Sequence, residues 1–125
     1  MRIMSAGSRP TTLGGAGAFS GHVTLDPIIG EDDAGLRANV VTFAPGARTY
    51  WHHHDYGQTL FVTHGEGRIC LRGEEPKPIR AGDTVWIPAG VEHWHGGAET
   101  TTMTHIAMQS SPHGGETHWL DEVTD

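Results

Sequence analysis

Histidine is concentrated in one short stretch of the sequence, YWHHHDYGQTL. Side chains alternate between the two faces of a β-strand, so His52 and His54 would share one face and His53 would point the other way. A hairpin turn at residues 55–57 could bring Gln58 back beside His54. Imidazole and amide groups gathered in this way could hold a transition metal. The alternation excludes the use of all three consecutive histidines as ligands of one ion.

Two more histidine-containing segments lie further along the chain. His93 and His95 are again two residues apart, just after the turn residues Pro-Ala-Gly, and would share a strand face. His105 and Gln109 share a face of the longest apolar run with Ala107, which indicates a common cavity. Three imidazoles and an amide oxygen form a coherent set of nitrogen and oxygen ligands, although affinity alone does not select one divalent metal.

The elements that must position these groups are short β-strands. Runs rich in Val, Ile, Thr and aromatic residues are separated by Gly, Pro and Asp turns, which favours an all-β sandwich or barrel. A helix is conceivable only around residues 31–36 and from Glu116 onward. The predicted strands are residues 22–25, 38–43, 47–54, 58–64, 68–72, 77–79, 84–87, 92–95 and 101–109.

Length and charge narrow the class of protein. The 125 residues are enough for one domain, and the Gly-rich residues 1–18 predict a flexible N-terminal arm before a barrel domain of residues 19–125. The net charge of −7, with no basic run, argues against nucleic acid or a membrane surface as a partner. The single cysteine, Cys70, fits a buried apolar position and a cytoplasmic location. No apolar stretch is long enough to span a membrane.

Two spaced motifs resemble those of the cupin superfamily. The first is Gly46-x5-His52-x-His54-x3-Gln58-x6-Gly65, and the second is Gly82-x5-Pro88-x-Gly90-x2-His93-x3-Gly97. The resemblance implies an antiparallel jelly-roll barrel of six to eight strands around one divalent metal. The ligands that it implies are His52, His54, Gln58 and His93. The sequence departs from the usual pattern in having Gln58 in place of a glutamate and Gly97 in place of an asparagine.

A narrower resemblance covers most of the chain. The strings PGARTYWHHHDYGQTLFVTHGEG, HWHG and TMTHIAMQ are similar to those of small bacterial cupins that act as manganese-dependent hydroxynitrile lyases, which also have glutamine at this position. The resemblance implies a cavity that takes a small molecule, with manganese as the expected metal and Fe, Zn, Ni or Co as alternatives. It implies that the lining residues are Asn39, Val41, Thr49, His95, His105 and Gln109.

The missing carboxylate ligand favours redox-neutral chemistry. Neutral ligands leave the full +2 charge on the metal, which strengthens its pull on an alkoxide or cyanide. In a lyase, His95 or His105 would remove the hydroxyl proton of a cyanohydrin. One alternative is an iron-dependent dioxygenase that uses His52, His54 and His93, and another is a metal- or ligand-binding cupin without catalysis.

The remaining histidines have no partner at ligand spacing. We expect His53 to be structural or exposed, and we assign no chemical role to His22, His64, His113 or His118. Strands at the rims of small jelly-rolls commonly pair with another subunit, so we expect a homodimer or homotetramer.

Overall fold

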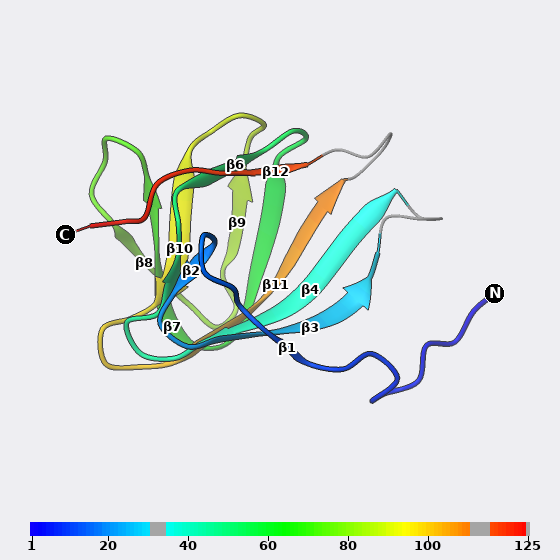
Figure 1. Cartoon of the computed structure of the whole chain (residues 1–125). Helices are drawn as coiled ribbons and strands as arrows, with labels where there is room; N and C mark the ends of the chain where they lie inside the picture. The colour runs from blue at the N-terminus through cyan, green and yellow to red at the C-terminus, as the bar shows by residue number, and fades with distance from the viewer. Residues whose placement is uncertain (31–34, 111–115, 125) are drawn as a thin grey trace.

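The chain folds as a curled antiparallel sheet without a helix in the parts that the computed structural model describes, residues 1–30, 35–110 and 116–124 (Figure 1). This confirms the predicted all-β cupin-type barrel. The barrel wall is broken into twelve strands in these parts, more than the six to eight expected. They are β1 (Thr12–Leu13), β2 (Phe19–Ser20), β3 (Val23–Ile29), β4 (Leu36–Phe43), β5 (Arg48–Thr49), β6 (His52–His54), β7 (Gln58–Leu71), β8 (Lys77–Arg80), β9 (Thr84–Ile87), β10 (His93–Gly97), β11 (Met103–Ser110) and β12 (Thr117–Trp119).

The sheet curls around its longest strand, β7. The strand order is β1-β3-β4-β11-β7-β10-β5-β2, and β8 and β9 also pair with β7. The first half of β7 lies between β11 and β9, and its second half lies between β10 and β8. One strand therefore belongs to both walls of the cup seen in Figure 1. This continuity places Gln58, at the start of β7, opposite the histidines of β10.

β7 passes straight through a segment that the sequence predicted to be a turn. Gly65, Glu66 and Gly67 were expected to end one strand and begin another, but all three lie within β7. A Cβ atom on Gly65 would lie 2.0 Å from the carbonyl oxygen of Thr102, and one on Gly67 would lie 2.2 Å from Sδ of Met103. The glycines are needed here for close packing against the neighbouring strand rather than for chain reversal. Gly96 and Gly97 likewise lie within β10 rather than after it.

The predicted strand of residues 47–54 is two strands, β5 and β6, with Tyr50 and Trp51 between them. The prediction of a possible helix from Glu116 is wrong, because Thr117–Trp119 form β12, which pairs with β6. The other possible helix, residues 31–36, falls mostly outside the described residues, and Leu36 begins β4.

The predicted N-terminal arm is partly paired with the barrel. Thr12 and Leu13, in β1, pair with Leu25 and Thr24 of β3. Residues before β1 are largely exposed, and Figure 1 shows this end of the chain extending away from the sheet. The division at residue 18 remains a prediction.

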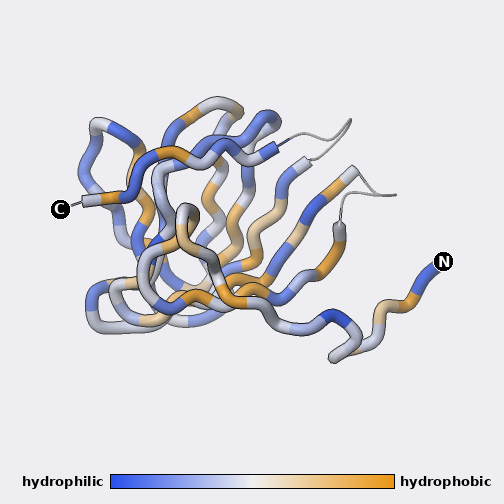
Figure 2. Tube along the Cα trace, viewed as in Figure 1, coloured by the Kyte–Doolittle hydropathy of each residue, from blue (hydrophilic) through white to orange (hydrophobic). Residues whose placement is uncertain are grey.

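Apolar side chains fill much of the barrel interior. Phe43, Leu60, Val62 and Met103 belong to the main cluster and are completely buried. Apolar and hydrophilic positions alternate along the strands in Figure 2, as expected for strands with one face on a core.

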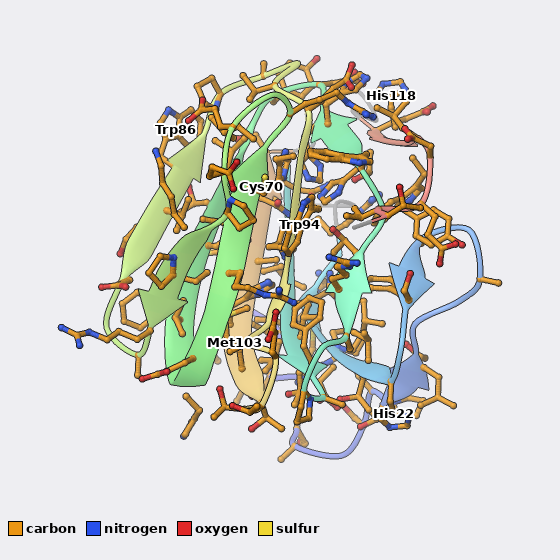
Figure 3. All side chains as sticks on the ribbon, turned by 90° about the vertical axis from the view of Figure 1, so that its left-hand side faces the viewer. His22, Cys70, Trp86, Trp94, Met103 and His118 are labelled. Carbon is orange, nitrogen blue, oxygen red and sulfur yellow. The ribbon has the colours of Figure 1, made fainter. Side chains whose placement is uncertain are left out.

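A second apolar cluster lies on the outside of β10. Cys70, Trp94 and Val123 form it, with Trp51 packed against them, and Figure 3 shows Cys70 and Trp94 close together on this side. Cys70 is buried and free, as predicted. In the described residues no helix is long and apolar enough to cross a membrane.

Candidate metal centre and cavity

A cavity of about 540 Å³ opens between the two walls of the barrel. All four residues predicted to contact substrate, Asn39, Val41, Thr49 and Gln109, line it. The ligand candidates His52, His54 and Gln58 also line it, together with His95. Ala107, expected to share a face with Gln109, lines it as well. The lining also contains residues that the sequence did not predict, namely Phe19, Leu25, Arg37, Glu116, Thr117 and Trp119.

The three consecutive histidines separate as strand alternation predicts. His52 and His54 are buried on the cavity side of β6, and their rings are 5.1 Å apart. His53 points to the opposite side, where its ring stacks on His118 at a centroid distance of 4.7 Å. His118 in turn contacts Asp55 at 2.7 Å. His53 therefore has no part in the cavity.

His93 joins the histidines of β6 because β10 pairs with both β6 and β7. It lies directly opposite His52, with ring centroids 4.2 Å apart, and is completely buried. Among the described residues, one group of nitrogen ligands lies within 4.8 Å of one another, that of His52, His93 and His95. His54 lies slightly further from His93, at a ring distance of 5.6 Å.

Hydrogen bonds to the backbone fix which ring nitrogen of His52 and of His93 keeps its lone pair. Nδ1 of His52 contacts the carbonyl oxygen of Tyr50 at 2.9 Å, and Nδ1 of His93 contacts that of Val91 at 2.8 Å. A carbonyl can only accept, so Nδ1 carries the hydrogen and Nε2 keeps a lone pair in each ring. Such bonds typically orient histidines that bind metals.

Gln58 presents its oxygen to this group. Its Nε2 donates to Oε1 of Gln109 at 3.3 Å, and its Oε1 lies 3.4 Å from Nε2 of His93. Both of the latter atoms carry lone pairs, and two acceptors facing each other in a buried site are stabilised by a cation between them. The arrangement fits a divalent metal, because the buried Nε2 of His54 also lacks a hydrogen-bond partner among the described residues.

Burial keeps these imidazoles neutral. Desolvation lowers the pKa of His54 and of His93 to about 4, and the neighbouring His93 adds to the effect on His54. Burial also lowers the pKa of His52 well below its usual value. Metal ligands must be unprotonated, so the rings are ready to bind near neutral pH.

His95 and His105 form a pair deeper in the wall. Nδ1 of His95 and Nε2 of His105 are 2.9 Å apart, and desolvation lowers the pKa of both, that of His105 to about 4. His95 lines the cavity, and its Nε2 has no hydrogen-bond partner in the described part of the chain. His105 does not line the cavity and lies behind His95. The two predicted catalytic candidates are therefore not equivalent, because only His95 faces the space that a substrate would occupy.

Two of the lining residues that the sequence did not predict belong to β12. Thr117 is paired with His54, and Trp119 is paired with His52, whose ring is 4.7 Å away. Thr117 and Trp119 are two residues apart, which is the strand spacing that placed His52 and His54 on one face. That signal was present in the sequence, but it was too short to identify a strand.

Comparisons with known proteins agree with this geometry. The cupin domain family matches residues 39–108, which include every predicted metal ligand. The chain is 45% identical over its whole length to an (R)-mandelonitrile lyase of Granulicella tundricola, covering 96% of that protein. It is 25% identical to an acireductone dioxygenase of Granulibacter bethesdensis, over 81% of this chain and 63% of that protein.

Solved structures contain the same fold. A crystal structure of a cupin-like protein from Thermotoga maritima superposes with a TM-score of 0.85 and is 35% identical, covering all of this chain and 92% of its own. The fold, the motif positions and these relatives agree, and the chain belongs to the cupin family.

Proposed function

We propose that this protein is a metal-dependent hydroxynitrile lyase that cleaves or forms cyanohydrins of aldehydes. The observation that carries the proposal is the unpartnered Nε2 of His95, a residue that lines the same cavity as His52 and His54, two of the proposed metal ligands. The full-length similarity to an (R)-mandelonitrile lyase supports the same reaction class.

We propose that His52, His54, Gln58 and His93 hold one divalent metal, with manganese the first choice and Fe, Zn, Ni or Co the alternatives. A bound divalent ion would supply a concentrated positive charge that favours an anionic oxygen or cyanide. The neutral oxygen of Gln58 leaves that charge undiminished, whereas a carboxylate would offset part of it. His95 is close enough to His52 and His93 to be a ligand as well. We leave it out of the ligand set because the lyase reaction requires its Nε2 to accept the substrate proton.

In the cleavage direction, Nε2 of His95 removes the proton from the cyanohydrin hydroxyl. The carbonyl double bond then forms, and the electron pair of the carbon–carbon bond leaves with cyanide. The Nε2–H group returns the proton to give hydrogen cyanide, so atoms and charge balance. This requires His95 to donate its Nδ1–H to Nε2 of His105, which then orients the base as the third group of a catalytic triad does. The hydrogen of His105 is then on Nδ1, which has no hydrogen-bond partner among the described residues, so this arrangement carries a cost in stability.

The cavity lining offers both apolar and polar contacts to the part of the substrate that does not react. Val41, Leu25 and Ala107 offer an apolar wall to the organic group of an aldehyde, and Thr49 and Asn39 offer polar contacts. A volume of about 540 Å³ is within the range of sites for small molecules. Aromatic aldehydes of the size of benzaldehyde are therefore suitable substrates.

The decisive experiment measures mandelonitrile cleavage to benzaldehyde with protein loaded separately with manganese and with iron. The lyase assignment predicts cleavage by the manganese form without oxygen consumption. His64→Gln, at an exposed position of β7, should leave the rate unchanged and serves as the matched control. Manganese-loaded protein that does not cleave cyanohydrins would contradict the assignment.

A dioxygenase remains the second candidate. Three histidines without a carboxylate can serve iron, and the compact group of His52, His93 and His95 is consistent with such a site. The more distant similarity to an acireductone dioxygenase favours the same alternative. Substrate-dependent oxygen uptake by the iron form would support it, whereas a non-catalytic cupin would show neither activity.

We also propose that the chain assembles as a homodimer or homotetramer. Val40, Ile106 and Phe61 are directly paired across β4, β11 and β7, so they share the outer face of the sheet. Trp86 of β9 joins that face and is 62% exposed. A second copy could cover this apolar strip.

The molar mass measured by light scattering tests this proposal. Wild type should have the mass of a dimer or a larger oligomer, and the double variant Phe61→Lys, Trp86→Lys should have a mass closer to that of a monomer.

The free Cys70 supports a cytoplasmic location for the enzyme. Fractionation of cells producing the untagged chain tests this location. Recovery of the protein outside the cytoplasmic fraction would contradict it.

A further inference from the structure

The short strand β12 places a hydroxyl group beside one of the proposed metal ligands, from a part of the chain that the two cupin motifs do not include. Thr117 pairs directly with His54 across β6 and β12, so both side chains point to the same side of the sheet. Thr117 also lines the cavity. It is therefore placed to contact Nδ1 of His54, one of the proposed ligands.

Four side chains form one continuous series of hydrogen bonds. Nε2 of Gln58 donates to Oε1 of Gln109 at 3.3 Å, and Nε2 of Gln109 donates to Oγ1 of Thr117 at 3.3 Å. Oγ1 of Thr117 then lies 2.9 Å from Nδ1 of His54. The series begins and ends on two of the proposed metal ligands, and it leaves Oε1 of Gln58 and Nε2 of His54, the proposed ligand atoms, outside it.

The position of one hydrogen decides whether His54 can bind a metal. If the Thr117 hydroxyl donated to Nδ1, the hydrogen of His54 would sit on Nε2, which is buried without a partner in the described chain. A buried unsatisfied N–H group is costly, and it could not act as a ligand. If Nδ1–H of His54 donates to Oγ1 instead, Nε2 keeps its lone pair toward the cavity.

The hydroxyl oxygen can satisfy both neighbours at once. It has two acceptor sites, one for Nδ1–H of His54 and one for Nε2–H of Gln109. Gln109 held in this way offers Oε1 to the amide nitrogen of Gln58, which leaves Oε1 of Gln58 directed at His93. One oxygen atom thus influences the orientation of both a histidine and an amide ligand.

We propose that Thr117 is a positioning residue that keeps Nε2 of His54 and Oε1 of Gln58 directed at the metal. The inference rests on the proposed ligand set. It also gives Gln109 a role beyond its predicted contact with substrate, as the connection between Thr117 and Gln58.

Three variants test the proposal. Thr117→Val preserves shape but removes the oxygen, and Thr117→Ser restores it. Thr104→Val is the matched control, because it removes a part-buried threonine hydroxyl that contacts Thr42 in the same barrel. Thermal unfolding of each full-length variant shows whether β12 is intact.

The first measurement is manganese affinity by competition with a chelator. Loss of an outer hydrogen-bond partner typically weakens metal binding by about 10- to 100-fold, and we expect this for Thr117→Val alone. Thr117→Ser and Thr104→Val should remain close to wild type. Wild-type affinity in Thr117→Val, or an equal loss in Thr117→Ser, would overturn the proposal.

The second measurement reads the ring hydrogen directly from nitrogen-15 chemical shifts of His54 in metal-free full-length protein. Wild type should carry the hydrogen on Nδ1, and Thr117→Val should move part of it to Nε2. A wild-type ring protonated on Nε2 would overturn the proposal even if the valine variant failed to fold. Neither measurement uses a cyanohydrin, so absence of lyase activity would contradict the proposed function while leaving this inference standing.

Discussion

His52 and His53 are neighbours in the chain but occupy opposite environments. His52 is 1% exposed, lies 4.2 Å from the ring of His93 and has a pKa lowered well below its usual value by burial. His53 stacks on His118 outside the barrel. The difference comes from strand alternation alone, and it shows that a histidine-rich stretch must be divided by face before chemistry is assigned to it.

The cavity face itself contains two kinds of histidine. His52 and His93 give Nδ1–H to backbone carbonyls, so Nε2 of each ring keeps its lone pair for a ligand. His95 has another imidazole, His105, as its Nδ1 partner. A carbonyl holds a neutral ring in one tautomer, whereas an imidazole partner can either donate or accept, so the first kind suits a ligand and the second suits a base.

The largest effect is expected from removing a proposed ligand on the cavity face. His93→Ala or His52→Ala should abolish stoichiometric metal binding, with a loss of affinity greater than the roughly 100-fold that loss of an outer partner can cost. Metal analysis of the purified variant against wild type measures this. Full metal content in either variant would contradict the assignment of His52 and His93 as metal ligands.

The distinction between ligand and base is tested at His95. His95→Gln should retain the metal but lower kcat for mandelonitrile cleavage by about 10²- to 10⁴-fold, the range associated with a general base. Metal content and kcat are measured on the same preparation. Loss of the metal would instead place His95 in the ligand set, as its proximity to His52 and His93 allows.

A smaller effect is expected when the amide ligand gains a charge. Gln58→Glu should retain the metal, because a carboxylate is a good ligand for a hard divalent ion. Gln109 can turn over to donate its Nε2 to the new carboxylate. Cyanide affinity and cleavage should fall by the equivalent of about 1–3 kcal/mol, because the added negative charge opposes an anion in a desolvated site. Unchanged cleavage at full metal content would contradict the electrostatic explanation of this glutamine.

The smallest effect on metal binding and stability is expected from a substitution on the face of β6 that points away from the cavity. His53→Ala should leave metal content unchanged and alter the free energy of unfolding by no more than about 0.5 kcal/mol, as is usual for a surface substitution. Denaturant unfolding and metal analysis measure the two quantities. Loss of metal here would mean that the two faces of β6 are not independent.

Much of the site could be predicted because its information is local. Strand alternation separated His53 from its neighbours, and the spacing of the cupin motifs selected the fold and a set of ligands that the structure brings together. Asn39, Val41, Thr49 and Gln109 were placed by resemblance, and all four line the cavity. Their chemical roles remain predictions.

The sequence by itself determined the all-β class, the domain's motif positions and the faces of the histidines, because a period of two residues is written into each short strand. Tertiary structure decided the rest. Gly65 and Gly67 could have formed a turn, and only the strand packed against them shows why they are glycine. Whether Thr117 reaches His54, and whether His105 stands behind His95, depends on pairing between strands far apart in the chain. Local patterns do not contain that long-range pairing, which folding settles by burying the barrel and satisfying its hydrogen bonds together.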